Sequence, residues 1–373
     1  GNQGKEQLSN APYGGAIRCE TSAAYRPTLY DCTFVSNVVI RFGAAYYGRG
    51  VFHRCTFFRN STTEGATYGC GAAVAGGDQD STDPARALLY DCTFISNKAY
   101  GSNSALGGGG IYLATAFDTV FRGNYAQNNG GGAVKSVLVR CKVLENRIPS
   151  GRSGAGLSAC VATNCLIAGN YTTGDWNRTY QGGGASNSDL VNCTVVSNSC
   201  VGRDSKGGGG LAYTEPGHAC YNTLIADNVD QSQGTGGVAV DVTANAPTLV
   251  NCTICGNSSS TRIGGVDKVV LVNSIVFGNQ GNADSIVAAT NSCASILTDT
   301  TKYPGCVTDD PKLDARYAPH RKSCRNSALP FDWMTDPNDV RSKDVYGNAR
   351  VKGPAAELGA VESPYFGLML LVR

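Results

Sequence analysis

The feature that most constrains this chain is a short motif, Cys-Thr-Phe-x-x-Asn or a near copy, that returns ten times along the sequence. The asparagines that end the copies are spaced by 22 to 37 residues, a period typical of solenoids with loop insertions. They are Asn37, Asn60, Asn97, Asn124, Asn146, Asn170, Asn198, Asn228, Asn257 and Asn279. If coils stack at the strand spacing of about 4.8 Å, these asparagines form a hydrogen-bonded ladder.

The residues around the motif's cysteine predict a strand with one buried face. Hydrophobic residues stand two positions before and after it, as Tyr30 and Phe34 do around Cys32. This period of two places the cysteine and both flanking positions in the core, and it also assigns His53 there. Only small residues occupy the cysteine position, and we expect its cysteines to be free, buried thiols. The cysteines of this structural ladder are Cys32, Cys55, Cys92, Cys141, Cys165, Cys193 and Cys252.

A second element, Gly-Gly followed by a small and an aliphatic residue, precedes nearly every copy, as in Gly14-Gly15-Ala16-Ile17. Glycine permits the positive φ and the close backbone approach that a corner requires. Each coil is therefore expected to contain a Gly-Gly strand, a turn, a Cys-Thr-Phe strand and a loop after the asparagine. The sequence predicts an all-β fold, a parallel β-helix of about ten or more coils over residues 1–290.

The repeat fades after about residue 290, where six prolines interrupt any regular series of strands. We expect residues 291–362 to form an irregular C-terminal cap, because an uncapped last coil exposes unpaired strand edges. Residues 363–373 form an apolar tail strand that either folds back on the rod or is donated to a neighbouring molecule.

Both parts of the chain resemble bacterial proteins. The Gly-Gly-Ala-Ile and Phe-x-x-Asn motifs over residues 14–280 resemble the repeats of chlamydial polymorphic outer-membrane proteins and related surface β-helices. The stretches Asp344 to Arg350 and Leu358 to Glu362 resemble the closing segment of secreted β-helices with a variable cell-surface anchor. The resemblance implies a right-handed β-helix, extracellular or on the outer cell surface, often an adhesin. Since Gly1-Asn2 resembles the end of a coil, we expect any signal peptide to lie upstream.

Composition excludes several classes of function. The net charge of +2 and the lack of a basic stripe argue against nucleic acid. No apolar run reaches the roughly 20 residues of a membrane span. No paired Cys-x-x-Cys pattern suggests zinc, and we expect no metal or other cofactor. Of the cysteines outside the ladder, Cys293, Cys306 and Cys324 can supply one disulfide in the irregular part.

Parallel β-helices host pectate lyases and polygalacturonases, but the sequence raises no catalytic residue above the others. The paired aspartates, Gly-His-Gly and Arg-x-Lys of polygalacturonase-like sites are absent. Asp31, Arg54 and Asp91 share one outward position, which favours a row of surface ion pairs. His218 and His320 fall in expected loops without an identifiable partner. We therefore assign no catalytic residue.

The loops after the asparagines vary in length and carry the better functional signal. Their aromatic and charged residues suit contact with a polysaccharide or a surface protein, or else cover the bases of the loops. The predicted ligand-binding residues are Tyr100, Tyr125, Tyr171, Asp175, Trp176, Arg178 and Tyr180. The sequence thus favours a non-enzymatic adhesin or structural rod. Its alternatives are a polysaccharide lyase or glycoside hydrolase of the pectate-lyase-like class and a filament subunit that self-associates through residues 363–373.

Overall fold

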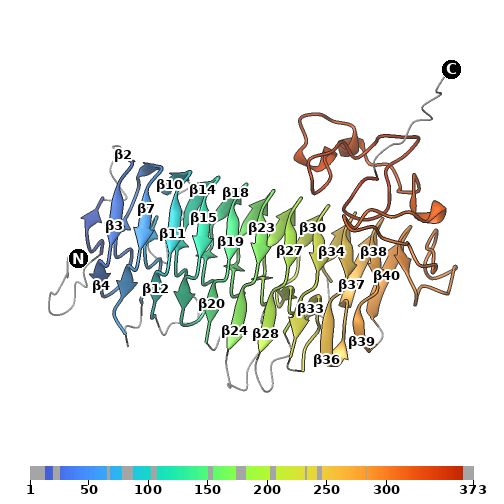
Figure 1. Cartoon of the computed structure of the whole chain (residues 1–373), viewed down its shortest axis with the longest axis horizontal. Coiled ribbons are helices and arrows are strands. Elements are labelled where there is room, and N and C mark those ends of the chain that lie inside the picture. Colours follow the sequence, from blue (N-terminus) through green and yellow to red (C-terminus); the bar gives the residue numbers. More distant parts are fainter. Residues whose placement is uncertain are drawn as a thin grey trace.

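The chain is a right-handed parallel β-helix, as the sequence predicts, and its coils stack into a rod (Figure 1). In the described residues every pairing between named strands is parallel, and the strands form four sheets. The computed structural model describes residues 13–19, 26–64, 68–77, 87–101, 107–149, 154–173, 182–201, 207–231, 233–241, 246–282 and 284–363.

A typical coil contributes one strand to each sheet in chain order, and we number the sheets accordingly. Sheet 1 follows the glycine pairs and contains β1 Ile17–Arg18, β5 Tyr46–Tyr47, β9 Val74–Ala75, β13 Ile111–Tyr112, β17 Ala133–Val134, β21 Leu157–Ser158, β25 Ala185–Ser186, β29 Leu211–Tyr213 and β33 Val238–Val240. Sheet 2 contains β2 Thr28–Tyr30, β6 Val51–His53, β10 Ala87–Tyr90, β14 Ala114–Phe117, β18 Val137–Val139, β22 Val161–Thr163, β26 Asp189–Val191, β30 Ala219–Tyr221, β34 Thr248–Val250, β37 Asp267–Val272 and β40 Ser285–Thr290.

The other two sheets follow the cysteine and asparagine positions. Sheet 3 contains β3 Thr33–Val35, β7 Thr56–Phe58, β11 Thr93–Ile95, β15 Val120–Arg122, β19 Lys142–Leu144, β23 Leu166–Ala168, β27 Thr194–Val196, β31 Leu224–Ala226, β35 Thr253–Cys255, β38 Ile275–Phe277 and β41 Cys293–Ala294. Sheet 4 contains β4 Val38–Val39, β8 Ser61–Thr62, β12 Lys98–Ala99, β16 Tyr125–Ala126, β20 Arg147–Ile148, β24 Tyr171–Thr173, β28 Ser199–Val201, β32 Val229–Asp230, β36 Ser258–Ile263 and β39 Gln280–Asn282.

A corner divides the predicted Cys-Thr-Phe strand into two strands. The residue before the cysteine position has a φ near +50° in every coil, which turns the chain from sheet 2 to sheet 3. These residues form a corner column: Asp31, Arg54, Asp91, Asp118, Arg140, Asn164, Asn192, Asn222, Asn251, Asn273 and Asn291. The turn breaks the period of two, so Phe34 points inward while Tyr30 points outward and is 56% exposed. The predicted burial of the position before the corner is therefore wrong, and His53 lies on the outer face, stacked between Tyr30 and Tyr90.

Inside the rod, identical side chains stack from coil to coil. Each ladder asparagine donates its side-chain N–H to the Oδ1 of the next at 2.8 to 3.0 Å, from Asn37 through to Asn279. From Asn60 on, the same amide also donates to a backbone carbonyl of the preceding coil, as Asn60 does to Phe34. The rings of Phe57 and Phe94 lie 4.5 Å apart and nearly parallel. None of the 16 cysteines, all of which lie in the described residues, forms a disulfide, and most of them are buried.

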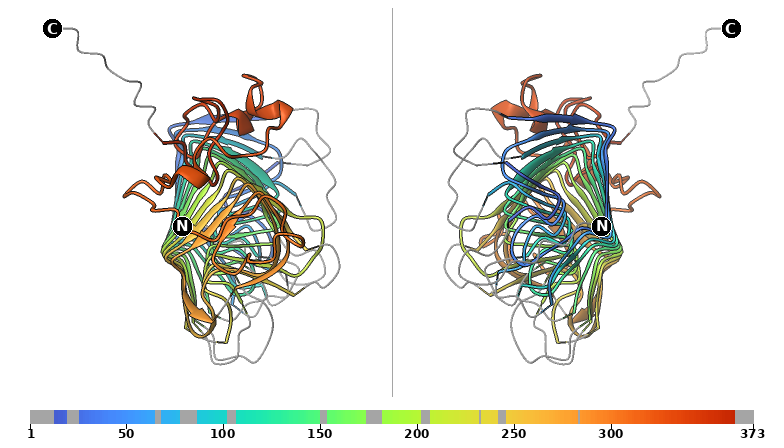
Figure 2. Two further views of the ribbon diagram at one scale, coloured as in Figure 1. Left: turned by 90° about the vertical axis from the view of Figure 1, so that its right-hand side faces the viewer. Right: turned by 90° about the vertical axis from the view of Figure 1, so that its left-hand side faces the viewer.

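The C-terminal part of the chain covers both the end and one side of the rod. Leu297 and Tyr303 are buried against the main core, and the Cys293–Val307 bridge begins a last irregular coil. Residues 308–363, here called the returning segment, then run back along the side of the last coils (Figures 1 and 2). They contain the 3₁₀ turns η1 Lys322–Cys324, η2 Asp332–Met334 and η3 Val340–Ser342. No helix in the described part of the chain is long and apolar enough to cross a membrane.

Asparagines of the corner column hold the returning segment in place. Asn192 donates to the Val340 carbonyl at 2.7 Å, and Asn222 donates to the Arg341 and Lys343 carbonyls at 2.7 and 2.9 Å. These contacts satisfy backbone groups of a segment that has little secondary structure of its own.

We expect Asn146→Ala, in the middle of the ladder, to lower the free energy of unfolding by about 3 kcal/mol, because it removes the acceptor of two buried Asn124 donors. The control Asn282→Ala removes an exposed side chain and should change the value by less than about 0.5 kcal/mol. Urea unfolding followed by circular dichroism measures both. Equal losses in the free energy of unfolding would show that a buried ladder amide contributes no more to stability than an exposed one.

Candidate ligand-binding surface

Sheet 4 brings three of the predicted binding residues onto one outer face. Tyr125, Arg147 and Tyr171 are in register on β16, β20 and β24, so they form a single column along the rod. Lys98 continues the column on β12, and Tyr100 follows that strand with its ring centroid 5.4 Å from that of Tyr125. We call these five residues the sheet 4 array.

The alternation of the short strands explains why these side chains face outward. The neighbouring residues Ala99, Ala126 and Ile148 point inward and are fully buried in a small apolar cluster. The array residues therefore stand on the opposite face of a packed sheet. Tyr125 and Tyr171 lie in strands rather than in the loops that the sequence suggested. The other predicted binding residues, Asp175, Trp176, Arg178 and Tyr180, lie outside the described residues.

The array is cationic as well as aromatic. The Arg147 guanidinium lies 5.3 Å from the Tyr125 ring centroid, a cation–π distance, and both Arg147 and Lys98 are exposed. Neither cation forms an ion pair with any described residue. Burial raises the pKa of the Tyr125 phenol, and Tyr100 and the Glu64 carboxylate act in the same direction, whereas the Arg147 guanidinium lowers it.

Sheet 2 carries a second aromatic column, which the sequence placed in the core. The rings of Tyr30, His53, Tyr90 and Phe117 stack at 4.8 to 5.0 Å, within 10° of parallel. Their faces are occupied by one another, so ring edges face the solvent. This geometry is less suited than the sheet 4 array to stacking on a ligand.

Exposed ion pairs lie beside that stack in the corner column. Arg54 donates two hydrogen bonds to the Asp31 carboxylate at 2.7 and 2.8 Å, and Arg140 does the same to Asp118. The hydrogen bonds from Arg54 lower the pKa of Asp31. A carboxylate held ionised in this way is a poor general acid.

Two histidines have carboxylate partners, one a coil away in sequence and one six residues away. The Nδ1 atom of His218 lies 3.1 Å from Asp189, and this hydrogen bond lowers the pKa of the aspartate. The Nε2 atom of His320 lies 3.2 Å from Asp314. Among the described residues no hydroxyl or thiol is hydrogen-bonded to either imidazole, so neither pair forms a nucleophilic triad.

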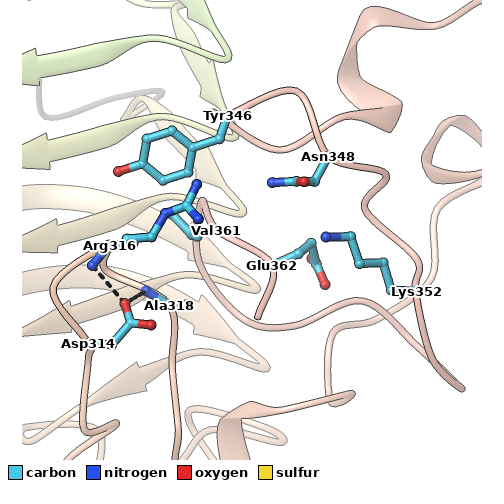
Figure 3. Close-up of a pocket in the computed structure, with 8 residues that line it drawn as sticks. All are labelled: Asp314, Arg316, Ala318, Tyr346, Asn348, Lys352, Val361 and Glu362. Atoms are coloured by element: carbon cyan, nitrogen blue, oxygen red, sulfur yellow. Dashed lines mark hydrogen bonds between the residues drawn. The ribbon is translucent and has the colours of Figure 1, made fainter. Parts of the chain in front are cut away.

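The returning segment contains a small open pocket of about 110 Å³ (Figure 3). The Arg316 guanidinium lies 5.1 Å from the Tyr346 ring centroid on one side, and Lys352 extends toward Glu362 and Asn348 on the other (Figure 3). The full lining is Asp314, Arg316, Ala318, Tyr346, Asn348, Lys352, Val361 and Glu362.

Beneath this pocket lies a buried ionic cluster built from the C-terminal motifs. Arg350 has no solvent exposure and lies 3.1 Å from the Glu362 carboxylate. It also donates to the Gly359 and Glu357 carbonyls, both at 2.9 Å. Asp344 accepts the Glu362 backbone N–H. Burial raises the pKa of Glu362 to about 8, although Arg350 acts in the opposite direction.

No protein-family model matches this chain, and no curated protein matches it. Among solved structures, the chain is similar to the one described as "Crystal structure of pectate lyase Pel9A" at 12% sequence identity and a TM-score of 0.42. The match covers 91% of this chain and 89% of that one. In the described residues, no group of three or more His, Cys, Asp or Glu side chains could hold a metal ion.

We expect Arg350→Met to destabilise the returning segment by about 3–5 kcal/mol, because it leaves the buried carboxyl and carbonyl groups that Arg350 contacts without their partner. Arg316→Met, an exposed cation of the same segment, is the matched control and should have little effect. Limited proteolysis across a urea gradient measures the change. Similar protection of the two variants would contradict the structural role of Arg350.

The pKa of Glu362 predicts a pH dependence. The folded protein binds this proton more tightly than the unfolded chain, where the pKa is near 4.5. The resulting stability is fully present below about pH 4.5 and is lost as the pH rises through about 8. The wild type should therefore lose up to about 1.4 kcal/mol per pH unit in this window, relative to Glu362→Gln. If the free energies of unfolding of the two proteins changed equally with pH, this contribution of Glu362 would be ruled out.

Proposed function

We propose that this protein is an extracellular or cell-surface β-helix that binds a polysaccharide along the sheet 4 array without cleaving it. The observation that carries the proposal is the register of Tyr125, Arg147 and Tyr171 on consecutive coils. A flat column of aromatic and cationic side chains along a rod suits an extended, repeating ligand, as an adhesin or structural rod would require.

The chemistry of the array favours an acidic polysaccharide. Tyrosine rings present an apolar body that can stack on sugar rings and a hydroxyl that can hydrogen-bond them. Exposed Arg147 and Lys98 can pair with uronate or sulfate groups of such a chain. Consecutive coils are about 4.8 Å apart, so Tyr125 and Tyr171, two coils apart, offer contacts about 10 Å apart along the ligand.

Several observations favour binding over cleavage. A glycoside hydrolase normally uses a pair of carboxyl groups that flank the bond to be broken. Among the described residues beside the array, Glu64 is the carboxylate whose charge reaches Tyr125, and the two array residues that carry a full charge are cations. Self-association through residues 363–373 stays a prediction, since all but the first of these lie outside the described residues.

The test is titration of the full chain with acidic and neutral polysaccharides, with released unsaturated and reducing ends assayed in the same samples. Tyr171→Ala and Arg147→Ala should each weaken binding of an acidic chain about tenfold, the equivalent of about 1.4 kcal/mol. The matched control is Tyr30→Ala, which removes an exposed tyrosine on sheet 2 and should leave the affinity unchanged.

Each outcome decides the proposal. Binding that is weakened only by the array variants and yields no new ends supports it. Released products would make the protein an enzyme. Equal losses in Tyr30→Ala, or no binding to any polysaccharide, would overturn the assignment of the array and favour a protein ligand.

A further inference from the structure

Two cysteines from different parts of the fold meet where the returning segment covers the last coil. Cys293 lies in β41, the last strand of sheet 3, and Cys324 ends the 3₁₀ turn η1. Both side chains are fully buried, and both belong to one hydrophobic cluster with Ile275, Met334 and Leu358. That cluster joins the outer face of sheet 3 to the returning segment.

Backbone hydrogen bonds fix this arrangement on both sides. The Cys324 carbonyl accepts the Leu358 N–H at 2.9 Å, and the next amide, that of Gly359, donates to Asn273 of the corner column at 2.8 Å. On the other side the Cys293 N–H donates to the Ser274 carbonyl at 2.8 Å. Cys324 is therefore held against the coil that carries Cys293.

The two thiols are also electrostatic neighbours. Their interaction lowers the pKa of Cys324 and raises that of Cys293, whose thiol donates to the Asp309 carbonyl at 3.2 Å. The Arg321 guanidinium acts in the same direction on Cys324, whereas burial acts in the opposite direction. Of the two, Cys324 is thus the better thiolate nucleophile.

The cysteine ladder inside the rod has a different geometry. Its members, such as Cys141 and Cys165, sit in register on neighbouring coils, where the sheets fix the backbones about 4.8 Å apart. A disulfide needs Cβ atoms about 3.8 Å apart, so closing one there would distort the sheets. Cys324 lies in an irregular segment that can adjust to meet Cys293.

We propose that Cys293 and Cys324 form a disulfide that fastens the returning segment to the end of the β-helix. The Cys324 thiolate attacks a disulfide of an external oxidant, and one sulfur of that oxidant leaves as a thiolate. The Cys293 sulfur then displaces the second one, so that two electrons and the two thiol protons pass to the oxidant as a dithiol. Formation in the cell rests on the extracellular location in the proposed function, because such bonds persist in oxidising compartments.

Because both sulfurs are buried, disulfide exchange can occur only while the returning segment is not docked. Neither sulfur is accessible in the closed structure, so exchange must happen before the returning segment docks or during its transient opening. Once formed, the bond restrains the segment that carries the pocket and the buried ionic cluster. Its reduction would leave hydrogen bonds and apolar contacts as the attachment.

The experiment uses the full chain, refolded with oxidised and reduced glutathione and compared with the same protein under excess reductant. Non-reducing peptide mapping should join the peptides of Cys293 and Cys324, and the intact mass should fall by about 2 Da. Proteolytic release of the returning segment should be about tenfold slower in the oxidised protein. This readout does not depend on polysaccharide binding, so its failure and that of the proposed function are distinguishable.

Variants identify the pair. Cys293→Ser and Cys324→Ser should each abolish the cross-link and the slower release, whereas Cys306→Ser, at the third cysteine of this region, should retain both. The wild-type protein with and without reductant tests the same point if a variant fails to fold. A reduced Cys324 in the folded, oxidised protein, or its pairing with Cys306, would overturn the proposal.

Discussion

The buried asparagine ladder is the interaction on which the rest of the structure depends. Each amide of the ladder's interior accepts from the coil before it and donates to the coil after it, so one asparagine per coil fixes the register of its neighbours. A shift of one residue would leave several buried donors and acceptors unpaired at every step. Register is therefore specified by side-chain amides as well as by the backbone pairing of four sheets.

Because the register is fixed, equivalent residues of successive coils form a column along the rod. The residue that each coil contributes therefore determines the chemistry of that column. On sheet 2 aromatic rings follow one another and stack face to face. On sheet 4 an arginine separates Tyr125 from Tyr171, so a cation stands between the two rings. The same backbone rule thus gives a closed stack on one face and an open, charged array on another.

The sequence predicts the interior better than the surface. A period of two identifies the phenylalanines, which follow the corner within one strand. The ladder is identified by the recurrence of the asparagine itself, because a second positive-φ residue, such as Ser36, separates it from the phenylalanine. The outward direction of Tyr30 and His53 depends on the positive φ of Asp31 and Arg54. Aspartate tolerates a left-handed turn, but arginine rarely adopts one, so the early coils indicate the corner only weakly. Asparagines at the same position in later coils carry that signal. The partners of His218 and of the returning segment lie at least a coil away in sequence, where no local pattern reaches.

The residues at the outward positions of sheet 3 determine where the returning segment docks. In the early coils they include Thr33, Arg122 and Lys142, which are exposed, whereas in the late coils they are Leu224 and Ile275, which are buried. An outer face that becomes apolar requires a cover, and Ala360, Val361 and Leu358 supply it. The corner column changes at the same place from charged pairs to asparagines that bind backbone carbonyls. Two adjacent columns therefore change together, which means that the late coils and the returning segment form one structural unit.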